Sequence, residues 1–244
     1  MVSRHWQRVD EAVLRPLLDA VRAPQWKATL ILLSSTILML VWSYFASPEC
    51  LTPWFATGGS GGRAAAAVGS FVGCFVLLGV VPALLVTLVL RERLADYGVG
   101  PGVPLRTWAS AAVLVPVFVG IAYAARTDAA LLAKFPINPR AGASAGAFAL
   151  HAATYLLFYL GWEFHFRGFL LHGLRDSIGD TSAVLLQTMA SALLHIGSPA
   201  AETFGAIPAG VLWGVVALWS RSLASGFVQH CLLGLALDAF ICFG

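Results

Sequence analysis

A small set of ionisable side chains lies inside apolar stretches of the sequence, where water could not solvate them. A charged group at the centre of a membrane-embedded helix costs of the order of 2.5 to 3.5 kcal/mol even on a lenient scale, so we expect such residues to pair or to do chemistry. Glu163 is the only acidic residue that the sequence places well inside an apolar stretch, and a buried carboxylate needs a partner. The set comprises His151, Glu163, His165, Arg167, His195 and His230, with His172 and Asp238 closer to the ends of such stretches.

Arg167 is the expected partner, because it follows Glu163 by four residues in the segment GWEFHFRGFL (161–170). On a helix this spacing leaves the two side chains about 40° apart, on one face. Gly168 would let another helix approach that face closely. His165 and His172 lie roughly 180° to 200° round the helix from Glu163, so we expect them to be hydrogen-bonded or interfacial histidines outside the site.

Two more histidines come from separate apolar stretches: His195 ends LLQTMASALLH (185–195), and His230 lies within SLASGFVQHCLLG (222–234). A single intramembrane histidine is often a hydrogen-bond donor between helices. Two of them, together with the buried Glu163, are harder to explain as packing. A carboxylate and imidazoles can deprotonate a water molecule and stabilise the oxyanion that it creates. We therefore predict that Glu163, His195 and His230 are catalytic, with Arg167 holding Glu163 in place and charged.

The hydrophobic composition of the chain indicates that membrane-embedded helices hold these residues in place. The 244 residues are 59% hydrophobic and 11% charged, against about 25% charged residues in an ordinary soluble domain. We predict an all-α, polytopic membrane bundle with about seven to eight transmembrane helices, in a single membrane domain over 28–241 that follows a cytoplasmic or interfacial segment, 1–27. The expected spans are about 28–46, 64–90, 105–125, 145–175, 181–196, 204–220 and 222–241.

Charge indicates the setting of the chain. The net charge of +3 is too small and too scattered for nucleic-acid binding, so we expect the bilayer as the partner. Arg and Lys are concentrated before the first span and in alternate connections, which favours a cytoplasmic N-terminus and an outside C-terminus. Thirteen of the fifteen basic residues are Arg, a bias associated with GC-rich bacterial genomes. We expect a multi-pass protein of the bacterial inner (cytoplasmic) membrane.

Three short segments, in this order, resemble the motifs of the CAAX-protease and bacteriocin-processing family of intramembrane glutamic proteases. WEFHFRG (162–168) is similar to the first motif, two adjacent Glu, three residues and Arg, usually followed by Gly. SALLH (191–195) is similar to Phe, three residues and His, and HCLLG (230–234) to His, three residues and Asn or Asp. The resemblance covers roughly residues 90–240 and rests on the order and spacing of the motifs.

The resemblance implies a metal-independent endopeptidase that uses no cofactor and cuts membrane-associated or C-terminally tail-anchored proteins or peptides. By this resemblance Glu163 activates water, His195 orients it, and His230 stabilises the oxyanion. Trp162 stands where the family has its first Glu, and Gly234 stands where it has Asn or Asp. We expect Trp162 to shape a substrate pocket. The single-Glu form is similar to the myxosortases, which trim C-terminal sorting tails of bacterial surface proteins.

Three alternatives remain open on the sequence. Trp162 and Gly234 favour a catalytically inactive relative that acts as a membrane scaffold, immunity protein or small transporter. A serine-type protease could use Ser144, which lies in GASAG (142–146) and matches GxSxG on paper. A zinc-type protease could place the metal between Glu163, His195 and His230, although the sequence has no HExxH motif.

Overall fold

The structure is a computed structural model that describes residues 15, 25–55 and 59–244, and its regular elements within these ranges are all helical. Most of the predicted N-terminal segment, 1–27, lies outside the described residues. The long helices are α3 (Trp26–Val41), α5 (Gly59–Cys74), α7 (Pro104–Ala125), α9 (Ala145–Glu163), α11 (Asp180–Leu193), α12 (Ala200–Ser220) and α13 (Ala224–Phe243). The short ones are α4 (Pro48–Leu51), α6 (Val81–Leu84), α8 (Ala129–Lys134) and α10 (Gly173–Ile178).

Several of these helices continue through wider π-helical turns. α3 runs on into η2 (Trp42–Ala46), and α9 runs through η8 (Phe164–His172) into α10. α5, η4 (Phe75–Val80), α6 and η5 (Leu85–Leu90) form one continuous rod. Short 3-10 turns, η3 (Thr52–Phe55), η6 (Leu94–Tyr97) and η7 (Ala141–Ala143), lie in the connections between these rods.

Six helices in the described part of the chain are long and apolar enough to cross a membrane, which confirms the all-α, polytopic bundle. They are Trp26–Ala46, Gly59–Leu90, Pro104–Ala125, Ala145–Ile178, Ala200–Ser220 and Ala224–Phe243. The remaining predicted span, 181–196, is present as α11. Its 14 residues rise only about 21 Å, less than the roughly 30 Å of a hydrocarbon core, which is why six rather than seven to eight helices have spanning length.

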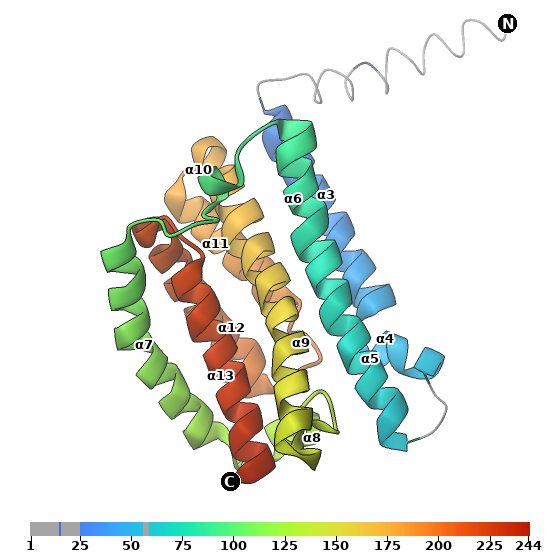
Figure 1. Cartoon of the computed structure of the whole chain (residues 1–244). Helices are drawn as coiled ribbons and strands as arrows, with labels where there is room; N and C mark the ends of the chain where they lie inside the picture. Colours follow the sequence, from blue (N-terminus) through green and yellow to red (C-terminus); the bar gives the residue numbers. More distant parts are fainter. Residues whose placement is uncertain (1–14, 16–24, 56–58) are drawn as a thin grey trace, which may run out of the picture.

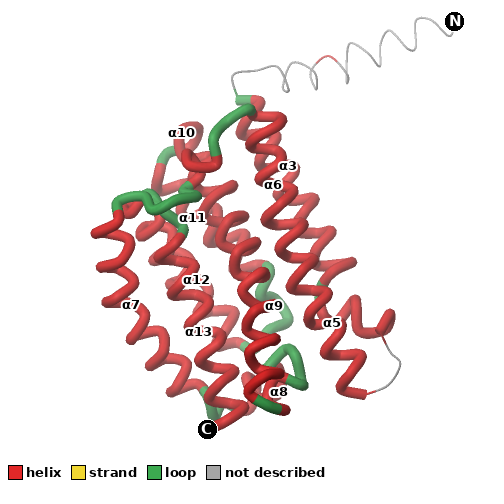
Figure 2. Tube along the Cα trace, in the orientation of Figure 1, coloured by secondary structure: helices red, strands yellow, loops and turns green. Residues whose placement is uncertain are grey.

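The rods form a bundle with α9 in its interior (Figure 1). α9 packs against α5 and η4 on one side and against α13 on the other, while α13 packs against α7 and α12 against α11. Figure 2 shows most loops at the two ends of the bundle and one loop beside α9, partway along it. The start of α3 and the end of α13 lie at opposite ends (Figure 1).

Small residues bring α9 close to the rod beside it. A Cβ added to Gly161 would lie 2.6 Å from the carbonyl oxygen of Cys74, and one added to Gly79 would lie 3.2 Å from the Cα of Gly161. Because lipid gives apolar side chains no reason to leave the surface, close backbone packing of this kind holds membrane helices together. The contact fixes α9 immediately before Trp162 and Glu163, the first motif.

Candidate active site

The first motif lies where α9 passes into η8, and this stretch is completely enclosed. Glu163 and Arg167 are each 1% exposed. Arg167 Nη1 lies 3.3 Å from Glu163 Oε1, so the ion pair expected from the four-residue spacing is present. The Arg167 guanidinium also lies over the Trp213 ring, 5.3 Å from its centroid. Wide π-type turns such as η8 are rare and recur at functional sites.

His230 of α13 joins this pair from the facing helix. Its Nδ1 donates a hydrogen bond of 2.8 Å to Glu163 Oε1. A neutral His230 in this arrangement carries its proton on Nδ1 and its lone pair on Nε2. The side chain of His230 is 16% exposed and that of Glu163 only 2%, so His230 is the member of the pair that can meet a substrate.

The packing around His230 fixes the plane of its ring. Trp213 stacks on the imidazole with ring centroids 4.4 Å apart, and Tyr159 contacts it edge-on at 4.8 Å. Trp213 Nε1 donates a 3.0 Å bond to Gln229 Oε1, and Gln229 Nε2 donates a 2.6 Å bond to Ser225 Oγ. These contacts from α9, α12 and α13 leave the imidazole little rotational freedom.

The second carboxylate oxygen, Glu163 Oε2, is buried and receives no hydrogen bond from the described residues. A Cβ added to Gly226 would lie 3.1 Å from this oxygen. Gly226 therefore leaves room beside Glu163 that a larger side chain would fill. A buried polar atom without a partner is costly, so this oxygen is free to accept a hydrogen bond from a further donor.

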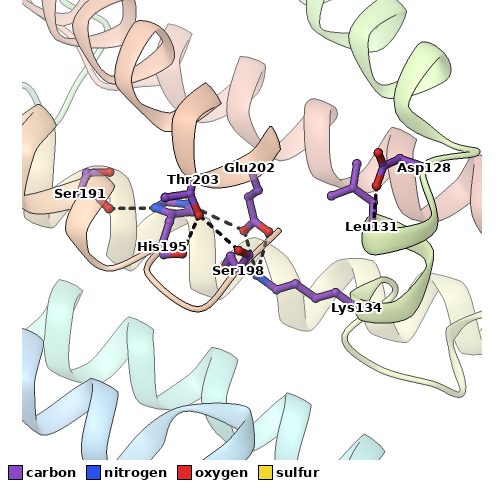
Figure 3. A network of polar contacts seen from close by, with 8 residues as sticks. All are labelled: Asp128, Leu131, Lys134, Ser191, His195, Ser198, Glu202 and Thr203. Atoms are coloured by element: carbon purple, nitrogen blue, oxygen red, sulfur yellow. Dashed lines mark hydrogen bonds and ion pairs between the residues drawn. The ribbon is translucent and has the colours of Figure 1, made fainter. Parts of the chain in front are cut away.

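His195 follows the end of α11 and has a different partner. Its Nδ1 donates a 2.8 Å hydrogen bond to the Ser191 carbonyl, which leaves Nε2 as the open nitrogen. Nε2 lies 3.9 Å from Glu202 Oε1 (Figure 3). The ring edge contacts Trp162, with 5.5 Å between the ring centroids. Burial lowers the pKa of His195 below its ordinary value, against the opposing effects of the Ser191 carbonyl and Glu202.

Part of the chain that includes these residues matches a known protein family. Residues 144–236 match the family described as type II CAAX prenyl endopeptidase Rce1-like. This segment is Rce1-like. It runs from the N-cap of α9 into α13 and contains Glu163, His195 and His230, so the resemblance to CAAX proteases is confirmed. Searches of curated proteins and of solved structures gave no match.

The Rce1-like segment does not bring the three predicted catalytic residues into direct contact. Glu163 and His230 are hydrogen-bonded, whereas His195 contacts Trp162 and Ser191 instead. His230 nevertheless helps to lower the pKa of His195, because two positive charges would repel each other. The two imidazoles therefore lie within electrostatic reach of each other. Among the described residues, no three His, Cys, Asp or Glu side chains gather closely enough to bind a metal ion.

Trp162 and Gly234, the two residues that differ from the family motifs, are both closely packed. Trp162 is 3% exposed and lies among Trp42, Phe158 and Phe166, with centroid distances of 6.0, 5.3 and 4.7 Å. At Gly234 a Cβ would overlap the hydroxyl of Tyr159. An Asn or Asp at position 234 is therefore incompatible with the observed position of the Tyr159 ring.

Glu163 is not the only completely enclosed carboxylate among the described residues. Asp238 lies within α13 and is completely buried, and its Oδ2 is 2.8 Å from Nε2 of the equally buried His151. Asp238 lies five residues before the end of α13, close to the helix end that the sequence indicates, and the start of α9 packs against this part of α13.

The sequence also gave no reason to select Glu202. It lies in the first turn of α12, at the polar end of an apolar stretch, where an acidic residue is ordinary. Its distance from His195 arises because the loop between α11 and α12 folds back. The only signal was its position seven residues after a candidate catalytic histidine.

Two of the other candidates, His165 and Ser144, have structural hydrogen-bond partners. His165 Nε2 lies 3.1 Å from Ser35 Oγ of α3, a hydrogen bond between helices that agrees with its expected place outside the site. His172 is also buried, 8% exposed. Ser144 is the N-cap of α9, and its Oγ accepts a 3.1 Å hydrogen bond from the Ala147 N–H. Its GxSxG context is thus explained by helix capping.

Proposed function

We propose that this chain is an intramembrane endopeptidase of the CAAX type that hydrolyses a peptide bond in a membrane-anchored protein or peptide. The observation that carries the proposal is the Glu163–His230 hydrogen bond, backed by Arg167, inside an apolar bundle and within an Rce1-like segment. Such groups are costly to keep in a membrane helix bundle. The proposed location is the bacterial inner membrane, with the bilayer as the surrounding partner and no nucleic acid.

Glu163 and His230 act as one unit in the proposed reaction. Glu163 Oε1 is already bonded by His230 and paired with Arg167, so it is a weak base, and we assign it the role of stabilising the charged form of His230. The imidazolium donates its Nε2–H to the oxyanion that forms at the scissile carbonyl. This differs from the role expected for Glu163 from the resemblance, in which the carboxylate itself takes the proton from water.

His195 is the proposed proton acceptor for the attacking water. A lowered pKa keeps it neutral near pH 7, with the Nε2 lone pair open. Nε2 takes a proton from water, and the resulting hydroxide oxygen bonds to the carbonyl carbon. When the C–N bond breaks, the His230 imidazolium gives its proton to the leaving nitrogen, and His195 returns its proton to His230 through water. No metal is needed in this sequence of steps.

A binding or scaffold function is the second candidate, and the packing of Trp162 favours it. An indole occupies the place of the first Glu in the related motif, and aromatic rings surround it. In that case Glu163, Arg167 and His230 would join α9 to α13 without catalysis.

The test compares membrane and surface proteomes of cells that carry the wild-type protein or Glu163→Gln at equal abundance. Glu49→Gln, on the exposed face of α4, is the matched control for loss of a carboxylate. Uncut precursors that accumulate only with Glu163→Gln would support the protease and name its substrates. Matching proteomes at equal protein levels would favour the scaffold.

A further inference from the structure

The loop that carries His195 is tied down from two neighbouring elements (Figure 3). Lys134, the last residue of α8, donates from Nζ to both oxygens of Glu202, at 2.9 and 2.8 Å, and to Ser198 Oγ at 2.7 Å. Thr203 Oγ1 of α12 donates a 2.8 Å bond to the His195 carbonyl. α8 is itself capped by Asp128, whose Oδ1 accepts from two backbone N–H groups. The cluster thus positions Glu202 against the loop.

Glu202 is the carboxylate that faces the open nitrogen of His195. The Ser191 carbonyl occupies Nδ1, so Nε2 is the only ring nitrogen that can accept a proton. Its distance of 3.9 Å from Glu202 Oε1 is too long for a direct hydrogen bond. It does fit one water molecule that donates one O–H to Nε2 and the other to Oε1. A water held in this way directs its lone pairs away from both acceptors.

An ion pair alone is a weak explanation of this cluster. The side chains of Lys134 and Glu202 are 29% and 22% exposed, and pairs so accessible to solvent add little to stability. The Lys134 ammonium does, however, hold the Glu202 carboxylate in place through both oxygens, with Oε1 3.9 Å from His195 Nε2. The Trp162 ring closes the apolar side of the same imidazole. Two acceptors thus lie beside a hydrophobic wall, an arrangement that suits a bound water molecule.

We propose that Glu202 is the second carboxylate of the active site and that it holds the attacking water together with His195. This inference rests on the proposed peptidase function. The water donates to His195 Nε2 and Glu202 Oε1, and its proton passes to Nε2 as its oxygen bonds to the carbonyl carbon. Glu202 then faces the new imidazolium and stabilises it. α12 thereby supplies the carboxylate that position 162 of α9 lacks.

The proposal predicts opposite effects from the two members of the ion pair. The charged or titratable groups acting on His195 are Glu202 of α12, Lys134 of α8 and His230 of α13. Glu202 raises the pKa of His195, and Lys134 lowers it. Glu202→Gln should therefore lower the pKa of His195, and Lys134→Met should raise it. Loss of the tie on the loop would be common to both substitutions, so opposite shifts in the His195 pKa separate the effect of the Glu202 charge from displacement of the loop.

The experiment measures the His195 pKa by NMR of histidine-labelled full-length protein in nanodiscs, with His195→Gln assigning the signal among six histidines. The pKa is expected to fall in Glu202→Gln and rise in Lys134→Met. No change in Glu202→Gln, or a shift of the same sign in both variants, would overturn the proposal. This measurement needs no substrate, so its outcome does not depend on the proposed function.

Cleavage of a precursor identified by the proteome comparison supplies the second readout. Because His195 must be neutral to accept a proton, activity is lost as pH falls through its pKa. That acid limb should move to lower pH in Glu202→Gln and to higher pH in Lys134→Met. Glu202→Gln should also lower kcat roughly tenfold to a hundredfold. A Glu202→Gln variant with wild-type kcat and pH profile would overturn the role of Glu202, while a wild type that cuts nothing would overturn the proposed function itself.

Discussion

His230 and His195 each have one hydrogen-bonded ring nitrogen and one open ring nitrogen, but their partners differ. In each, Nδ1 is bonded, His230 to the Glu163 carboxylate and His195 to the Ser191 carbonyl, and Nε2 is left open. A carboxylate stabilises the charged form of an imidazole more than a carbonyl does. This difference separates the two roles: His230 suits a proton donor to an oxyanion, and His195 suits a proton acceptor.

The close approach of the Tyr159 hydroxyl to Gly234 can be tested by substitution. Gly234→Asn should lower both stability and cleavage, because the Asn Cβ would overlap the Tyr159 hydroxyl. Adding Tyr159→Ala, which clears that space, should recover stability relative to Gly234→Asn alone. Thermal unfolding in detergent checks both variants. A single Gly234→Asn variant as stable as wild type would show that Tyr159 moves freely.

The ion pair within the first motif could be predicted from sequence, and its long-range partners could not. A four-residue helical spacing fixes where Arg167 lies relative to Glu163. The contact of Glu163 with His230 crosses 67 residues and depends on how α9 faces α13. Glu202 reaches His195 only through the course of a loop. Such contacts depend on tertiary packing, which local periodicity does not contain.

At the level of elements, α9 and α13 face each other along a polar stripe. His151, Tyr155, Tyr159 and Glu163 recur every fourth residue on α9, and Gly226, His230, Gly234 and Asp238 do so on α13. His151 pairs with Asp238 and Glu163 pairs with His230, so the two helices run antiparallel. Each end of the interface thus has an imidazole paired with a carboxylate, and tyrosines lie between them.

The His151–Asp238 pair should be a stability determinant separate from catalysis. Both side chains are completely buried, so Asp238→Ala leaves His151 without its partner and should destabilise the fold by about 3–5 kcal/mol. The double change His151→Phe with Asp238→Leu should recover much of that loss, because it removes both polar groups. Denaturant unfolding in detergent micelles measures the difference. An Asp238→Ala variant of wild-type stability would contradict this assignment.

The helices themselves were largely evident from hydropathy. Spans expected at about 105–125 and 204–220 correspond to α7 at Pro104–Ala125 and to α12, which begins four residues earlier, at Ala200. The misplaced start of α12 comes from the polar Glu202 and Thr203, which bond to Lys134 of α8 and to the His195 carbonyl instead of facing lipid. The π-helical turns of η8 have no distinctive composition and could not be read from sequence.

At the scale of the whole molecule, the bundle presents an apolar outer surface and a polar interior stripe. Leu88, Leu105, Val113, Leu150 and Phe204 are all largely exposed, as expected for side chains that face lipid. The start of α3 and the end of α13 lie at opposite ends of the bundle (Figure 1). We therefore expect the two ends of the described chain to lie on opposite sides of a membrane, with α11 as a seventh, shorter crossing.

The distribution of basic residues predicts which side each end occupies. A reporter that is active only in the cytoplasm should be inactive when fused after Gly244 and active when inserted at Arg221, in the loop between α12 and α13. Activity after Gly244 with none at Arg221 would reverse the orientation without changing the fold. Activity at both positions would contradict the crossing of α13.

The most direct test of the account is cleavage by the purified full-length protein in liposomes, with a precursor found in the proteome comparison. The account predicts a cut by wild type and by Glu49→Gln, with Glu163→Gln at least about a hundredfold slower although folded to the same extent. Cleavage by Glu163→Gln at the wild-type rate would contradict it, because the buried carboxylate that bonds His230 would then be dispensable for the chemistry.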